Sequence, residues 1–165
     1  MPAFARISPC LWFDSQAEEA ANYYTSIFPN SRITEVARYP AVGQEIHHQP
    51  AGAVMTVAFE LDGTPFTALN GGPVFKFTEA VSFQIMCADQ QEVDHYSTRL
   101  GEGGDPNAQQ CGWVKDKFGL SWQVVPRVLL ELTTSKDPGV AEKAFGAMLK
   151  MKKIDIAELE RAVKA

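Results

Sequence analysis

Residues 7–20 read ISPCLWFDSQAEEA, and residues 81–93 read VSFQIMCADQQEV. In each stretch a short apolar run is followed at once by a polar residue and, three positions later, by an acid: Ser15 with Glu18, and Asp89 with Glu92. This spacing is typical of the start of a helix, where a side chain accepts a hydrogen bond from a backbone N–H of the first turn. The sequence therefore predicts a strand–helix junction that occurs twice.

The residues after the first junction predict three further strands. Residues 32–39 read as a weaker strand and residues 40–52 as a loop. Two firmer strands follow at 54–61 and 64–69, on either side of Asp62-Gly63. That pair favours a two-residue hairpin turn, because both of its central positions need a positive φ. The first junction thus extends into a βαβββ unit.

The second junction starts the same order of elements again. A strand at 81–87 precedes a helix that begins near Asp89 and ends at Gly101, and residues 110–115 and 120–126 read as a hairpin. The tail after Asp137 carries two amphipathic helical patterns. We predict an α+β fold of paired βαβββ modules with C-terminal helices. One domain would span 1–165, with module one at 5–73, module two at 80–127 and a helical cover at 128–165.

Residue parity predicts which side of each sheet is covered. Alternate side chains of a strand point to opposite faces, and the apolar sets around Leu11 and Ile85 suit the face under the helices. Trp122 is predicted to join that core, and Trp113 lies at a rim whose register the sequence leaves open. The open face is expected to carry Ser8, Cys10, Trp12, Phe66, Ala68, Asn70, Ser82, Gln84, Met86, Ser121, Gln123 and Val125.

Composition excludes several classes of function. The 165 residues carry 15 Lys plus Arg against 20 Asp plus Glu, and a net charge of −5 argues against nucleic-acid binding. No stretch approaches the ~18 apolar residues of a membrane span, and the N-terminus lacks a secretory pattern. We expect a cytoplasmic protein whose three widely spaced cysteines stay reduced.

Three stretches carry a resemblance to a known family: AEEA at 17–20, CGWVKDKFGLSWQVVP at 111–126 and MKKID at 151–155. With them the chain resembles the PhnB-like branch of the glyoxalase/bleomycin-resistance/dioxygenase (vicinal oxygen chelate) superfamily. Many members of that branch carry the label 3-demethylubiquinone-9 3-methyltransferase. The resemblance implies a cupped sheet that holds a small molecule, often with a divalent metal, and commonly a homodimer. A fold does not by itself supply a reaction.

The resemblance also implies where a metal would bind. Metal-dependent members place His, Gln or Glu at positions that correspond here to Ser8, Asn70, Ser82 and Gln123, or to Pro9 if the first strand is shifted by one residue. None of these is a histidine or a carboxylate. Neutral amides and hydroxyls seldom hold a divalent ion tightly, so we predict no tightly bound metal.

Other catalytic groups find little support in the sequence. His47 and His48 fall in the predicted loop, and His95 lies on the second helix. Cys10 is predicted to face the open side, but no cation or imidazole that would activate its thiol is evident. The sequence has no Gly-x-Ser-x-Gly elbow.

The methyltransferase label is not supported by a cofactor motif. An adenosyl cofactor is typically seated by a glycine-rich turn between a strand and a helix, whereas Gly101, Gly103 and Gly104 follow a predicted helix. We therefore predict no cofactor.

The open face mixes uncharged hydrogen-bonding groups with apolar ones, which is typical of a ligand pocket. We predict a small-molecule-binding protein with no nucleic-acid or membrane partner, whose ligand contacts Ser8, Cys10, Trp12, Asn70, Ser82, Gln84, Trp113, Ser121 and Gln123. Whether it is an enzyme is left open. One alternative is a lyase, isomerase or dioxygenase that uses a weakly held metal ion. Another is an interaction module built on strand 32–39 and the C-terminal helices, and in a third Gln84 and Gln123 bond each other and fill the cavity.

Overall fold

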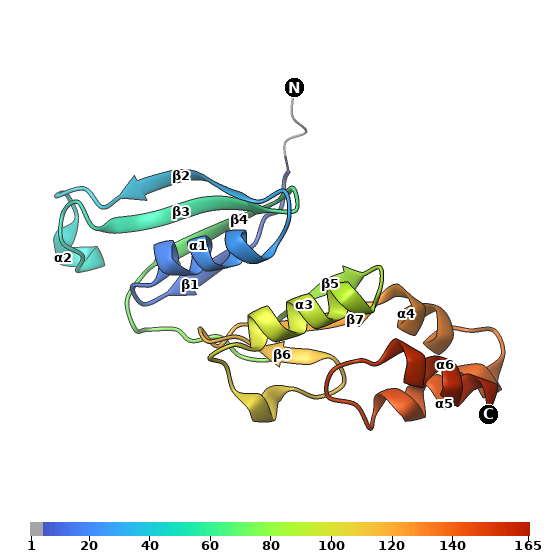
Figure 1. Cartoon of the computed structure of the whole chain (residues 1–165). Coiled ribbons are helices and arrows are strands. Elements are labelled where there is room, and N and C mark those ends of the chain that lie inside the picture. Colours follow the sequence, from blue (N-terminus) through green and yellow to red (C-terminus); the bar gives the residue numbers. More distant parts are fainter. Residues whose placement is uncertain (1–4) are drawn as a thin grey trace. The chain divides into compact units, whose positions relative to one another are not determined.

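The computed structural model describes residues 5–165 and divides the chain into two compact units, Met1–Lys76 and Phe77–Ala165 (Figure 1). The boundary falls inside the segment that was predicted to join the two modules. Each unit contains one sheet with a helix packed on one face, and the second unit also contains the C-terminal helices. The predicted α+β fold class is confirmed.

The first unit has the predicted βαβββ order with one short helix added. β1 is parallel to β4, and the other neighbouring strands are antiparallel, in the order β1-β4-β3-β2. The added helix α2 lies in the predicted loop. The elements are β1 (Cys10–Phe13), α1 (Ala17–Ile27), β2 (Arg32–Arg38), α2 (Gln44–His47), β3 (Val54–Leu61) and β4 (Thr64–Asn70).

An aromatic cluster forms the core between α1 and its sheet. Tyr24 of α1 stacks on Phe59 of β3 with ring centroids 6.3 Å apart, and Phe59 stacks on Phe66 of β4 at 5.5 Å. Each such side chain contributes roughly 1.5–3 kcal/mol when it is fully removed from water. Around the cluster the buried residues are Leu11, Phe13, Ala17, Ala20, Ala21, Ile27, Val57, Leu61 and Ala68.

The second unit repeats this plan with one strand fewer. Its sheet has the order β5-β7-β6, with β5 parallel to β7 and β6 antiparallel to β7. Within residues 77–165 no strand corresponds to β2, because residues 102–112 form turns and a short 3-10 helix. The elements are β5 (Ser82–Cys87), α3 (Gln90–Gly101), the 3-10 helix η1 (Pro106–Ala108), β6 (Trp113–Lys115) and β7 (Ser121–Pro126).

Local chemistry explains the missing strand. Pro106 has no backbone N–H to give to a neighbouring strand. A Cβ at Gly104 would overlap the carbonyl oxygen of Lys115, so glycine lets this loop pack directly on the edge of β6. The loop takes the place that a fourth strand would occupy.

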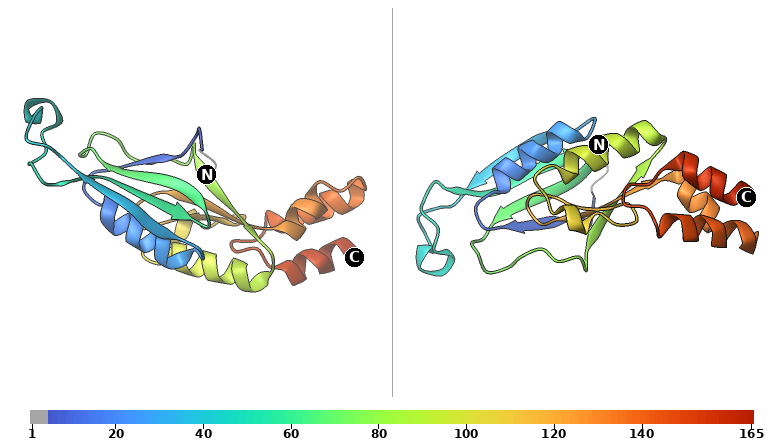
Figure 2. Two further views of the ribbon diagram at one scale, coloured as in Figure 1. Left: turned by 90° about the horizontal axis from the view of Figure 1, so that it is seen from above. Right: turned by 60° about the horizontal axis from the view of Figure 1, so that its bottom comes forward.

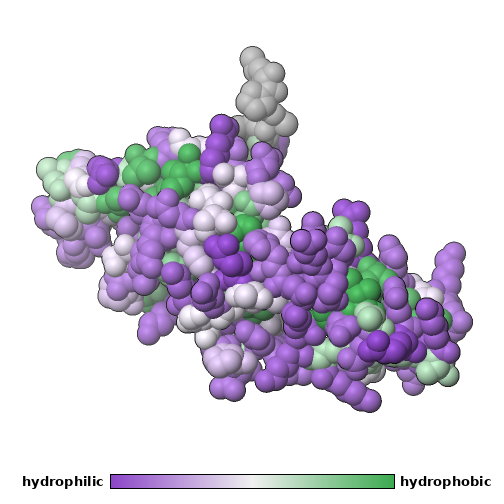
Figure 3. All heavy atoms as spheres, in the orientation of Figure 1, coloured by the Kyte–Doolittle hydropathy of each residue, from purple (hydrophilic) through white to green (hydrophobic). Residues whose placement is uncertain are grey.

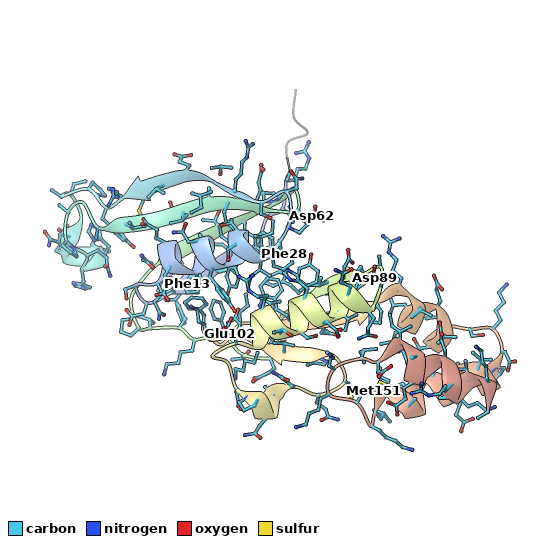
Figure 4. The ribbon with its side chains drawn as sticks, viewed as in Figure 1. Phe13, Phe28, Asp62, Asp89, Glu102 and Met151 are labelled. Atoms are coloured by element: carbon cyan, nitrogen blue, oxygen red, sulfur yellow. The ribbon has the colours of Figure 1, made fainter. Side chains whose placement is uncertain are left out.

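The two predicted helix starts have different outcomes. Asp89 accepts a hydrogen bond from the Glu92 N–H at 2.9 Å, and the Glu92 side chain accepts one from the Ala88 N–H at 2.7 Å, so the cap of α3 is confirmed. Asp89 and Glu102 mark the two ends of this helix in Figure 4. The predicted pair of Ser15 and Glu18 is wrong, because α1 begins after Gln16 without a side-chain cap from its own sequence.

Three helices follow β7 and belong to the second unit: α4 (Arg127–Thr133), α5 (Pro138–Met148) and α6 (Ile156–Lys164), which gather at one end of it (Figure 2). The two predicted helical patterns correspond to α5 and α6, and α4 was missed. Gln90 ties α6 to α3, since its side chain accepts from the Ile156 N–H at 2.9 Å and donates to the Ile154 carbonyl at 3.0 Å.

The surface of these helices is mixed in character. Phe145 and Leu149 are about half exposed, at 51% and 50%, and Leu130 is 41% exposed. Figure 3 shows apolar patches among hydrophilic side chains over this end of the chain. In the described part of the chain no helix is long and apolar enough to cross a bilayer.

Candidate functional site

The strand register of the second unit gathers polar side chains on one face of its sheet. Ser82 lies opposite Ser121, and Gln84 lies opposite Gln123. On the other side of β7, Trp113 also lies opposite Gln123, and Lys115 opposite Ser121. Directly paired residues share a face, so one face carries all six residues, and we call it the polar face: Ser82, Gln84, Trp113, Lys115, Ser121 and Gln123.

The opposite face of this sheet is the core under α3. Ile85, Trp122 and Val124 are at most 8% exposed and pack with Val93 and Leu100 of α3. The prediction that Trp122 belongs to the core is confirmed. Trp113, whose register the sequence left open, lies on the polar face and is partly buried.

Hydrogen bonds within the polar face leave one amide facing solvent. The Gln123 side chain donates to the Ser82 hydroxyl at 2.9 Å. Gln123 thus gives one amide N–H to Ser82, and the alternative in which Gln84 and Gln123 bond each other is not formed. The Gln84 side chain is exposed, and Met86 beyond it is 39% exposed. Ser121, in contrast, is only 2% exposed.

Lys115 carries the only charge among the six residues of the polar face. Its ammonium lies 2.7 Å from the Glu79 carboxylate, in the segment before β5. The hydrogen bond from Lys115 and its positive charge lower the pKa of Glu79, and the same contact raises the pKa of Lys115. Both groups therefore carry their charge at neutral pH.

A buried aspartate holds the hairpin that presents these side chains. Asp116 is 2% exposed and accepts hydrogen bonds from the Phe118 N–H at 2.9 Å, the Leu120 N–H at 3.1 Å and the Trp122 indole N–H at 2.9 Å. Asp116 was not among the predicted site residues. Its signal is an aspartate that begins a four-residue turn before a glycine, where the side chain can organise the backbone.

The open face of the first sheet carries Cys10 and Trp12, as predicted. They pair with Thr67 and Leu69 of β4, and burial raises the pKa of the Cys10 thiol. The Trp12 indole N–H donates to the Gly72 carbonyl at 2.9 Å, and its ring meets Phe75 edge-on at 4.9 Å. Ser8 is exposed just before β1.

Asn70 lies on the opposite face from the one predicted. It pairs with Phe13 and, like Phe66 and Ala68, faces the α1 side of the sheet, so the predicted placement of all three is wrong. Its amide oxygen accepts from the Ala17 N–H at 2.8 Å, and its amide nitrogen donates to the Val54 carbonyl at 3.2 Å. Asn70 thus supplies the cap that α1 does not obtain from its own sequence.

The positions that the resemblance matches to metal ligands do not fit a metal here. Ser8, Asn70, Ser82 and Gln123 offer only neutral oxygens and amides. The Asn70 amide is used by α1 and β3, and the Gln123 amide nitrogen is used by Ser82. Residues 5–165 contain no group of three or more His, Cys, Asp or Glu side chains that could hold an ion. Divalent metals bind most firmly to anionic or imidazole donors, and these positions lack both.

None of the three histidines belongs to the polar face. His47 is partly buried in α2, where its ring lies 4.7 Å from that of Tyr39 and its Nδ1 accepts from the Gln49 N–H at 3.0 Å. His48 is exposed, and its backbone is left-handed, with a φ of 56°. His95 is exposed on α3 beside Tyr96.

A hollow of about 560 Å³ lies between the starts of α3 and α6. Asp89 and Asp155 in its wall are already bonded to the first turns of these helices, and Lys153 pairs with Asp94 at 2.6 Å. Lys150, Lys152 and Lys153 form a basic cluster in the sequence, and of these Lys153 forms an ion pair within the fold. Most charged side chains in the wall of this hollow are therefore already bonded within the protein.

The chain matches the family described as 3-demethylubiquinone-9 3-methyltransferase over residues 5–125. A PhnB protein from Bacillus cereus is 32% identical, with 74% of this chain and 99% of that chain covered and a TM-score of 0.62. Protein PA1353 from Pseudomonas aeruginosa is 18% identical, covers 74% of this chain and 98% of its own, and gives 0.57.

A weaker structural likeness, with a TM-score of 0.47 and 17% identity, is to a fosfomycin resistance protein from Listeria monocytogenes, covering 78% of this chain and 98% of that one. No curated protein matches the chain.

Proposed function

Because the chain belongs to the 3-demethylubiquinone-9 3-methyltransferase family, the PhnB-like branch of the glyoxalase-fold proteins, we propose that it binds a small molecule on the polar face. The observation that carries this proposal is the register of β5, β7 and β6. It puts two glutamines, a tryptophan and a lysine on the face of the sheet that α3 does not cover.

The chemistry of the polar face suits a ligand that carries oxygen. An exposed glutamine side chain offers both donors and an acceptor, so Gln84 can bond a carbonyl or a hydroxyl. Trp113 supplies a large apolar surface two strands away, on the other side of Gln123. A few fixed polar groups among apolar ones give orientation and specificity in small-molecule sites. The hairpin held by Asp116 keeps Trp113 and Lys115 in place.

The proposal does not include the methyl transfer that the family's description names. β1 passes into α1 through Asp14, Ser15 and Gln16, and β5 passes into α3 through Ala88 and Asp89. Neither junction contains the glycines that let a backbone approach the phosphates or the adenosyl part of a cofactor. The proposal also does not include metal-assisted turnover. The positions that would hold the ion offer only uncharged donors: Ser8, Asn70, Ser82 and Gln123.

Native mass spectrometry of the purified protein followed by a thermal-shift screen tests the proposal. The screen would include catechol and the hemithioacetal of methylglyoxal with glutathione, and turnover of both would be followed in parallel. We expect a bound compound to raise the Tm of the wild type and of Gln91→Ala, an exposed glutamine on α3. Gln84→Ala and Trp113→Ala should lose this shift.

Two results would count against the proposal. Stabilisation that survives both Gln84→Ala and Trp113→Ala would place the ligand elsewhere, and a screen without any stabilising compound would remove its basis. Turnover of the hemithioacetal or of catechol would instead favour an enzyme.

A further inference from the structure

Lys115 projects from the polar face at a point where a ligand can reach it. Its side chain is 29% exposed, and it lies two residues from Trp113 on the same strand and face. Two residues of a β-strand span roughly 6.6 Å. A carboxylate oxygen lies about 4 Å from the centre of the ring that bears it, and a charge-assisted hydrogen bond adds about 2.8 Å, which together match this spacing. The ammonium and the indole can therefore contact the two ends of one small molecule.

The present partner of Lys115 is held weakly. The side chain of Glu79 is 61% exposed and belongs to the segment before β5, outside any helix or strand. A pair of this exposure adds little stability, because solvent screens the charges and two long side chains must be ordered. A ligand that displaces Glu79 loses little by doing so, and it regains a charge-assisted hydrogen bond of the same kind.

From these contacts we propose that the ligand of the polar face is a planar carboxylate, whose ring lies on Trp113 and whose carboxylate replaces that of Glu79 on Lys115. The inference rests on the proposed function and adds to it the chemical class of the ligand. Glu79 then has a second role, since it satisfies the ammonium while the face is empty and competes with anions for it. Gln84 remains free to bond a further oxygen on the ring.

Benzoate and benzamide are suitable probes, because they share a ring and differ in charge. Each is titrated into isotope-labelled full-length protein, and binding is read from the indole N–H signal of Trp113, assigned with Trp113→Phe. We expect the wild type to bind benzoate more tightly than benzamide. Glu79→Gln should raise the affinity for benzoate by roughly 1.5- to 5-fold, which corresponds to the loss of an exposed ion pair, and should leave benzamide unchanged.

The lysine variants complete the test. Lys115→Met should bring the ratio of the two affinities to about one, and Lys115→Arg should restore the preference for benzoate, because arginine also pairs with carboxylates. Lys136→Met and Glu142→Gln change the same charges at exposed positions outside the polar face and serve as matched controls. The rest of the amide spectrum reports whether each variant is folded.

The outcomes separate this inference from the proposed function. If both probes move the Trp113 signal with equal affinity, and Lys115→Met changes nothing, the carboxylate inference is overturned while binding on the polar face stands. If neither probe moves the signal of Trp113, the carboxylate inference is overturned, and the thermal-shift screen decides the proposed function separately. A preference for benzoate that disappears only in Lys115→Met supports both.

Discussion

Cys87 and Asn70 show how single buried residues shape this chain. Cys87 is fully buried beneath α3. Burial, with a smaller contribution from the negative charges of Glu92 and Asp89, raises the pKa of its thiol from the ordinary 9.0 to about 12. The folded protein therefore holds this proton over a pH range in which the unfolded chain releases it.

This difference predicts a loss of stability at alkaline pH. The stabilisation is fully present below pH 9.0 and is lost as the pH rises toward 12, because only the unfolded state gains from releasing the proton. Above pH 9 the free energy of unfolding of the wild type should fall more steeply than that of Cys87→Ala, by up to ~1.4 kcal/mol per pH unit. Urea titrations at several pH values measure both slopes, and parallel slopes would contradict the prediction.

Asn70 predicts a second effect at the residue scale. Asn70→Ala removes the acceptor for the Ala17 N–H, in a buried bond, and the donor to the Val54 carbonyl, in a partly buried one. Leaving such groups unpaired should lower the free energy of unfolding by about 1–3 kcal/mol. Asn22→Ala, which loses only an exposed bond within α1, should change it by less than ~0.5 kcal/mol. Equal effects of the two variants in urea unfolding would refute this role.

The face of Asn70 could not be predicted from the sequence alone. In 64–70 the two candidate faces are nearly equally apolar, with Phe66 and Ala68 on one and Pro65 and Leu69 on the other. Asn70 was assigned to the open side because the resemblance matches it to a position that holds a metal ligand in metal-dependent members. The groups that bond it, on α1 and β3, are far away in the sequence and meet it only in the fold.

Among the elements, the β6–β7 hairpin decides whether the polar face exists. In Asp116→Asn the new amide can still accept from the backbone, but its NH₂ group would face the indole N–H of Trp122. A buried donor without an acceptor should cost about 1–3 kcal/mol of unfolding free energy and weaken any ligand that contacts Trp113. Asp105→Asn, an exposed turn residue that keeps its bond to the Asn107 N–H, should be near neutral.

Circular dichroism during urea unfolding and the ligand affinity of each folded variant measure these two effects. If Asp116→Asn is as stable as the wild type, Asp116 is not the residue that fixes the hairpin.

Sequence patterns predicted most elements well, and the failures have physical causes. The strand–helix junctions, both hairpins and two C-terminal helices are found where apolar periodicity and turn residues placed them. The second unit lacks its fourth strand because Gly104 and Pro106 favour a packed loop over strand pairing. This loop depends on the close approach of Gly104 to Lys115, which exists only in the fold and cannot be recognised in the sequence. α4 was missed because it follows β7 directly at Pro126.

On the scale of the whole molecule, family membership and the repeated units agree on the fold, while assembly stays a prediction. The resemblance predicts a homodimer, and the half-exposed Phe145 and Leu149 offer apolar surface in the described chain. Size-exclusion chromatography with light scattering should give twice the chain mass of 18.1 kDa. A mass of one chain at micromolar concentration would contradict the dimer.

The polar face is the central claim, and its most direct test is a map of ligand-induced shifts in the amide and side-chain N–H signals of the protein. With a compound found by native mass spectrometry, the largest shifts should fall on the side-chain amides of Gln84 and Gln123 and on the indole N–H of Trp113. Shifts that leave these three signals in place and gather around Asp89 and Asp155, at the hollow between α3 and α6, would contradict the claim.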